Sequence, residues 1–144
     1  MKRRPGLNMI ERALIEQRWR QTAIQAEIQA VMSDDSDRMV DAAGRVLFVV
    51  LGACMAEEAD QDSPALHSLY DGVEAVHEQA EEPVIVAARR ARIIAALETC
   101  AFLIPLFDRK SLVDSACDLA LKMRRQHIRL SDFEPLMKPT KETA

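Results

Sequence analysis

The sequence predicts an all-α protein, a five-helix, bundle-like domain with a long N-terminal helix, two central apolar helices and a short C-terminal turn. Two segments, 39–56 and 93–107, are apolar runs with few charges, and both are longer than buried strands usually are. Aromatic residues are few, and the apolar content comes mainly from Ala, Leu, Ile, Val and Met, which favours helix over sheet. We therefore expect the two apolar segments to form the core.

The first apolar segment shows the helical period directly. Its apolar side chains recur at steps of three and four, as on one face of a helix. These positions are Met39, Val40, Ala43, Val46, Leu47, Val50, Leu51, Cys54 and Met55. A membrane-spanning helix needs about 20 apolar residues, and neither segment reaches that length between charges. Both are expected to be core helices, with no membrane involved.

A single domain is expected over residues 1–137, with a frayed tail at 138–144. The chain has 144 residues and no linker rich in Pro, Gly or Ser. Its first residues are basic, but charges interrupt the apolar stretch that a signal peptide would need. We therefore expect no targeting segment, and the odd number of cysteines points to the cytoplasm.

A long first helix is predicted from Leu7 to Val31. Its seam positions alternate steps of three and four over more than three heptads, a spacing typical of helix–helix contacts. The seam consists of Leu7, Ile10, Leu14, Gln17, Gln21, Ile24, Ile28 and Val31. The polar middle at Gln17 and Gln21 fits an antiparallel crossing with a symmetry mate, or a place where the helix overhangs its own core.

The first helix also carries a second apolar stripe, with Trp19 between Ile15 and Ala26. A helix with two apolar stripes usually has two partners, so we expect a homo-oligomer. The predicted oligomer interface consists of Leu7, Ile10, Leu14, Gln17, Trp19, Gln21, Ile24 and Ile28.

The middle helices follow from start and stop signals. Residues 33–37 are rich in side chains that cap a helix N-terminus, so the core helix is expected to begin there. After the acidic stretch 57–62, Ser63 and Pro64 supply an N-cap and a first-turn proline for the third helix. Residues 81–83 end that helix, and the fourth is expected to begin near Val84.

The C-terminal elements are predicted in the same way. Pro105 cannot donate a backbone hydrogen bond, so the fourth helix should stop or kink there. Residues 108–111 turn the chain into a fifth helix, which is expected to end in the basic stretch 122–127. Residues 131–134 have capping-box spacing, and one short turn is expected there.

Gly44 and Gly52 lie inside the predicted core helix, where glycine is less favourable than alanine for helix formation. Their presence suggests that another backbone comes close to each.

The three cysteines and the charges constrain function. Cys54, Cys100 and Cys117 are odd in number and have apolar helical neighbours, so buried, unbridged thiols are expected. The net charge of −4 conceals a segregation: residues 1–33 carry +3, residues 34–82 carry −11 and residues 83–144 carry +4. Such blocks are usually solvated faces, but they would also let opposite ends of neighbouring molecules attract.

One spacing resembles a metal site. Glu74 and His77 have the Glu-x-x-His spacing that places two ligands on one helix face. A di-metal centre needs a second such pair and two more inward carboxylates, and neither His67 nor His127 completes one. We predict no metal and no cofactor; a ligand- or metal-binding bundle that uses Glu74 and His77 is the alternative interpretation.

No catalytic signature is present. The chain has no Gly-x-Ser-x-Gly, His-Glu-x-x-His or glycine-rich phosphate loop, so we predict that it is not an enzyme. Two basic clusters, Arg89–Arg92 and Lys122–Arg129, allow a third interpretation as an accessory nucleic-acid binder. No recognition motif accompanies them, and nucleic acid is not the expected partner.

Each of the two apolar segments contains one solitary charge. Arg45 is the only charged residue between Asp41 and Glu57, and Glu98 is the only one between Arg92 and Asp108. If the central helices pack side by side, Arg45 and Glu98 are candidates for an ion pair, because a lone buried charge costs several kcal/mol; the alternative is that each reaches solvent separately. Together the observations predict a helical protein–protein interaction or regulatory protein that self-associates.

Overall fold

The structure is a computed structural model that describes residues 9–125 and Phe133. Its described part contains five α-helices, one short 3-10 helix and no strands, which confirms the predicted all-α fold. In chain order the elements are α1 (Met9–Met32), α2 (Ser36–Ala56), α3 (Pro64–Gln79), α4 (Ala87–Leu103), η1 (Ile104–Leu106) and α5 (Arg109–Arg125). The predicted tail at 138–144 and the turn at 131–134 lie outside the described residues, apart from Phe133.

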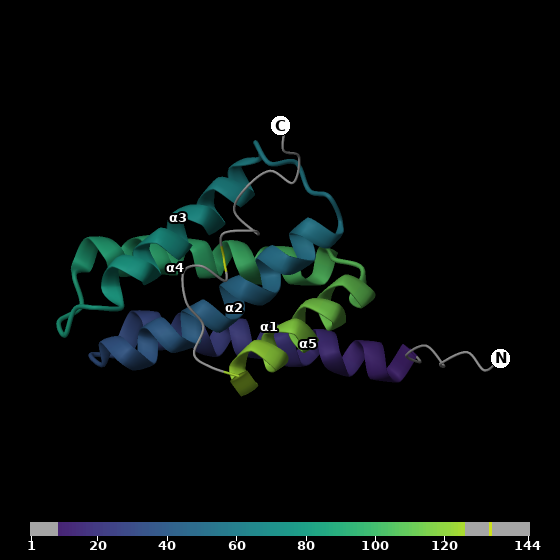
Figure 1. Ribbon diagram of the computed structural model, residues 1–144, viewed down its shortest axis with the longest axis horizontal. Coiled ribbons are helices and arrows are strands. Elements are labelled where there is room, and N and C mark those ends of the chain that lie inside the picture. Colours follow the sequence, from purple (N-terminus) through teal and green to yellow (C-terminus); the bar gives the residue numbers. More distant parts are fainter. Residues whose placement is uncertain (1–8, 126–132, 134–144) are drawn as a thin grey trace.

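Helix α2 is the centre of the molecule and contacts α1, α3, α4 and α5. Figure 1 shows it crossing the middle of the view, with α5 beside it. Its apolar run is almost entirely buried, from Val46 through Leu51. Among the described helices, α2 alone is long and apolar enough to cross a membrane by length and composition. Here that apolar surface is used for packing against four neighbouring elements.

Helices α3 and α4 form a closely packed pair. Gly72 on α3 lies against Ala96 on α4, so closely that an added side-chain carbon at Gly72 would collide with the Ala96 methyl group. Helix α1 then packs along α4 in the opposite direction. The start of α4 lies at the end of α1, and Arg109, just after η1, reaches back to Glu16 near the start of α1.

The packing of α5 on α2 explains one of the two core glycines. Ser115 of α5 lies directly against Gly52, and its hydroxyl donates a hydrogen bond of 2.8 Å to the carbonyl oxygen of Val49. A side chain at position 52 would displace Ser115. The expected close neighbour therefore exists at Gly52, although it is a side chain and not a backbone. At Gly44 the expectation is wrong, because an added carbon there would meet nothing within 4 Å.

The predicted helix starts are confirmed at α2 and α3. The Asp35 carboxylate accepts hydrogen bonds from the backbone N–H groups of Asp37 and Arg38, and Ser63 caps α3 ahead of Pro64. The start of α4 is later than predicted, at Ala87, and Val84 and Val86 are exposed.

The reason for this shift is Gln79, a fully buried side chain at the end of α3. Its amide nitrogen donates to the Val84 carbonyl and to the Ser36 hydroxyl, at 2.9 and 3.0 Å. Its amide oxygen accepts the Val86 N–H at 3.1 Å. These hydrogen bonds hold the segment between α3 and α4 in an extended conformation up to Val86, so α4 begins after it.

The end of α4 agrees with the position of Pro105. The α-helix stops at Leu103, and Ile104–Leu106 continue as a single 3-10 turn before the chain enters α5. Phe133 packs edge-on against Phe48 of α2, with ring centroids 5.7 Å apart.

Candidate functional site

The surface that stands out is the side of α1 that points away from the core. We call Ile10, Leu14, Gln17, Gln21, Ile24, Ile28 and Val31 the outer stripe; they are the described members of the predicted seam. All seven are exposed. Ile10 is 72% exposed, Leu14 59% and Ile28 54%. Leu7, the eighth seam residue, lies outside the described residues.

The opposite side of α1, which meets the core, carries small side chains. Ala23, Ala26 and Ala30 are almost completely buried against α2 and α4. Helix α1 thus buries alanines and part of Trp19, and it exposes isoleucine, leucine and valine on the outer stripe. A helix whose only partner was its own core would have the reverse distribution.

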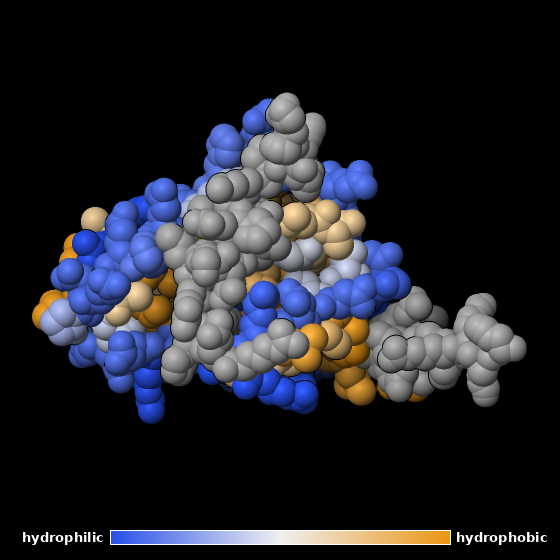
Figure 2. Space-filling model, viewed as in Figure 1, coloured by the Kyte–Doolittle hydropathy of each residue, from blue (hydrophilic) through white to orange (hydrophobic). Residues whose placement is uncertain are grey.

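Two large apolar residues outside α1 are also exposed. Phe102 of α4 is 67% exposed and Leu106 of η1 is 64% exposed. Both elements pack against α1. On the face seen in Figure 2, apolar atoms reach the surface beside the first half of α1. Sequence analysis did not single out Phe102 and Leu106. A helical wheel of residues 93–107 would have placed Phe102 on the exposed side, opposite Ile93 and Leu97.

A shallow hollow of about 500 Å³ lies at the middle of the outer stripe. Its lining residues are Ala13, Glu16, Gln17, Arg20, Gln21, Ile24 and Arg109. One wall is closed by an ion pair of 3.1 Å between Glu16 and Arg109, which ties α1 to the start of α5. The hollow therefore presents two amides next to apolar and charged groups.

Trp19, which the sequence analysis included in the oligomer interface, lies on another side of α1. It is half-buried and packs against the core of its own chain. It lines a second hollow, of about 490 Å³, between α1, α2 and α5, together with residues such as Ile15 and Met123. The structure thus separates the two apolar stripes of α1, with Trp19 on the inner one.

The first basic cluster, Arg89–Arg92, is engaged within the molecule. Arg92 contacts Asp71 at 2.9 Å and Glu78 at 3.1 Å, both on α3, and the hydrogen bond to Asp71 raises the pKa of Arg92. Arg89 lies 3.7 Å from Glu78. These cations neutralise part of the acidic α3 surface, and little positive charge is left to contact phosphates.

Arg90 has a different role in the same cluster. Its guanidinium donates hydrogen bonds to the carbonyl oxygens of Ala30, Val31 and Ser33, at 2.7, 3.2 and 3.1 Å. These carbonyls belong to the C-terminal end of α1, which has no basic residue in its own last turn. The cation therefore caps α1 from α4, where positive charge is favoured.

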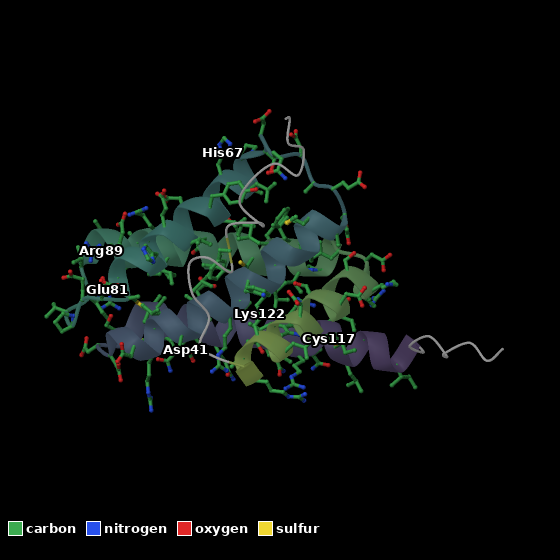
Figure 3. The ribbon with its side chains drawn as sticks, viewed as in Figure 1. Asp41, His67, Glu81, Arg89, Cys117 and Lys122 are labelled. Carbon is green, nitrogen blue, oxygen red and sulfur yellow. The ribbon has the colours of Figure 1, made fainter. Side chains whose placement is uncertain are left out.

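The second basic cluster, Lys122–Arg129, is only partly described. Lys122 and Arg124 lie on the last turns of α5, and residues 126–129 fall outside the described residues. Figure 3 shows Lys122 on α5 and Arg89 at the end where α3 turns into α4. The described parts of the two clusters do not form one positive face.

The Glu74/His77 pair gains no further ligands among the described residues. Both side chains are exposed on α3, and Glu74 lies 3.6 Å from Arg92. Over residues 9–125, no group of three His, Cys, Asp or Glu side chains could hold a metal ion.

The predicted ion pair between Arg45 and Glu98 is not formed. Arg45 pairs with Asp41, one turn earlier on α2, at 2.9 Å, while its Nε atom is buried without a hydrogen-bond partner. Glu98 is exposed and lies beside Glu27 of α1. The structure does not bring these two candidates together, and the alternative that each reaches solvent separately applies.

The Glu27–Glu98 contact is an unusual pairing of like charges. Partial desolvation and the charge of Glu98 raise the pKa of Glu27 above its ordinary value of 4.5. The two residues come from α1 and α4, and Glu27 is flanked along α1 by Ile24 and Ile28 of the outer stripe. No sequence pattern signals this contact, because it depends on how α1 and α4 are aligned.

The prediction of three buried thiols holds for two of them. Cys54 and Cys100 are buried, and burial raises the pKa of Cys54 to about 11 and that of Cys100 further. Cys117 is exposed on α5 because it falls outside the inward-facing positions Leu112, Ser115 and Leu119. All three are free of disulfides.

Comparison of the chain with protein-family models, curated proteins and solved structures gave no match.

Proposed function

We propose that this protein is a helical interaction protein without catalysis of its own, and that it self-associates through the outer stripe of α1. The observation that carries the proposal is the distribution of side chains on α1. Five large apolar residues of one regular stripe are exposed, while alanines fill the core side of the same helix. A row of exposed apolar side chains along one helix face is typical of interaction sites.

The outer stripe supplies part of an interface of standard size. Helix α1 has 24 residues and is about 36 Å long. A strip along it as wide as a helix, about 11 Å, covers roughly 400 Å², about half of the 800 Å² per partner of standard interfaces. The rest of a standard interface would come from residues beside α1.

The competing interpretations have less support. The metal interpretation needs ligands that the described part of α3 and its neighbours do not supply. The nucleic-acid interpretation needs a free basic face, and Arg89, Arg90 and Arg92 are all engaged by groups of the same chain. We assign the protein to the cytoplasm, as its three free thiols favour.

The test is the mass of the protein in solution, measured by light scattering at several concentrations. The wild type should be larger than a monomer at micromolar concentrations. The double variant Leu14→Glu/Ile24→Glu should be monomeric, because burying unpaired carboxylates costs several kcal/mol, or more than about 100-fold in dissociation constant.

A matched control places the same charges elsewhere. Val84 and Leu121 are also exposed apolar residues, but they lie before α4 and on α5. Val84→Glu/Leu121→Glu should keep the wild-type mass. A monomeric wild type at high micromolar concentration would disprove self-association.

A further inference from the structure

The outer stripe is symmetric in position along α1. Gln17 and Gln21 are each two residues from position 19, Leu14 and Ile24 are each five away, and Ile10 and Ile28 are each nine away. Leu7 and Val31 continue the relation in the sequence. When the stripe is reversed end to end, each apolar residue therefore takes the place of another apolar residue, and the two glutamines exchange places.

We propose, resting on the self-association proposed above, that two copies of α1 pair antiparallel across a two-fold axis near position 19. Each chain then presents the same patch to the other, as a two-fold interface requires. Ile10 meets the partner's Ile28, Leu14 meets the partner's Ile24, and Gln17 meets the partner's Gln21. The amides at the centre can donate to and accept from each other, so neither is left without a hydrogen bond.

Charge distinguishes this arrangement from a parallel pair. Lys2, Arg3 and Arg4 precede α1 in the sequence, and Asp34, Asp35 and Asp37 follow it. The three aspartates are exposed. In an antiparallel pair, the N-terminal end of one α1, which follows the cations, lies beside the C-terminal end of the partner's α1. The partner's aspartates come directly after that end. A parallel pair would place cations beside cations and acids beside acids, which is repulsive.

The rest of the fold leaves room for this contact. The outer stripe lies on the side of α1 opposite Ala23, Ala26 and Ala30, so a second α1 can approach without displacing α2 or α4. Arg90 and the Glu16–Arg109 ion pair attach the two ends of α1 to its own chain. The helix is therefore held as a straight, outward-facing element that needs little rearrangement on association.

The experiment is cysteine cross-linking of the full chain under mild oxidation, in a Cys117→Ser background. Three variants are compared: Leu14→Cys, Ile24→Cys and the double variant Leu14→Cys/Ile24→Cys. Positions 14 and 24 of one α1 are about 15 Å apart along the helix. A disulfide needs Cα atoms about 4.4–6.8 Å apart, so no bridge can form within one chain.

We expect the double variant to form covalent dimers efficiently and both single variants to remain uncross-linked. Val84→Cys, at an exposed site outside α1, measures cross-linking by random collision. Circular dichroism should show that each variant keeps its helices, as expected for exposed positions.

The outcomes separate this inference from the function on which it rests. Cross-linking of either single variant with itself would indicate a parallel pair and overturn the antiparallel arrangement. A dimeric mass without cross-linking of the double variant would place the interface elsewhere and would also overturn it. A monomeric mass for the unmodified protein would instead refute self-association itself.

Discussion

At the scale of single residues, the carboxyl pair Glu27–Glu98 is the most informative contact. Two acids from α1 and α4 lie side by side, and the pKa of Glu27 is raised by partial burial and by the charge of Glu98. The folded protein therefore holds this proton at higher pH than the unfolded chain does. Folding is therefore accompanied by proton uptake between pH 4.5 and the pKa of Glu27 in the folded protein. The contribution of this contact to the free energy of unfolding falls as the pH rises through that range.

The variant Glu27→Gln tests this coupling. It should raise the free energy of unfolding at pH 7, by less than about 1 kcal/mol because the pair is largely solvated, and should change it little near pH 4. Urea unfolding at both pH values measures the difference. Glu98→Gln should have the same effect, and the double variant should gain less than the sum. A Glu27→Gln variant with the wild-type pH dependence would contradict the assignment.

At the scale of elements, Gln79 joins three helices. It ends α3, bonds to the Ser36 hydroxyl at the start of α2 and fixes the backbone of Val84 and Val86 before α4. The side chain is completely buried, so its own amide groups depend on these partners for their hydrogen bonds. A single amide thus sets where α4 begins.

Replacing this amide should be costly. Gln79→Ala leaves buried polar groups unpaired, and we expect a loss of about 3 kcal/mol in the free energy of unfolding. Chemical denaturation monitored by circular dichroism gives the value. Gln25→Ala, which truncates an exposed glutamine on α1, is the control and should change stability by less than about 0.5 kcal/mol. An equal effect of the two variants would show that the buried network contributes nothing.

The elements themselves were largely predictable from the sequence. Periodicity and caps identified all five helices, and Asp35, Ser63 and Pro105 mark real boundaries. The start of α4 was not predictable, because Gln79 acts over a distance of seven residues through its side chain. Helical spacing also identified the outer stripe but could not show that alanines, and not the larger residues, face the core.

Contacts between helices were the least predictable part. Arg45 and Glu98 occupy similar places in their own segments, yet helix rotation sends them to different surfaces. Arg89, Arg90 and Arg92 resemble a phosphate-binding cluster in the sequence. Only the packing of α4 against α3 and α1 shows that each of these arginines has an internal partner.

At the scale of the whole molecule, the thin attachment of α1 has a further consequence. Its core side contributes three alanines, Ala23, Ala26 and Ala30, which bury little apolar area per residue, and the half-buried Trp19. Part of the free energy that keeps α1 folded against the body would then come from a second molecule. Protein concentration would enter the folding equilibrium as a ligand concentration does.

The midpoint temperature of unfolding should therefore rise with protein concentration. For a dimer that unfolds to monomers, each tenfold increase stabilises the assembly by about 1.4 kcal/mol. Calorimetry over a hundredfold range of concentration measures this, with Leu14→Glu/Ile24→Glu as a reference whose midpoint should not move. A midpoint independent of concentration in the wild type would mean that the core alone holds α1. If the midpoint does move, dilution alone would loosen α1, and the abundance of the protein in its compartment would set how much of it is fully folded.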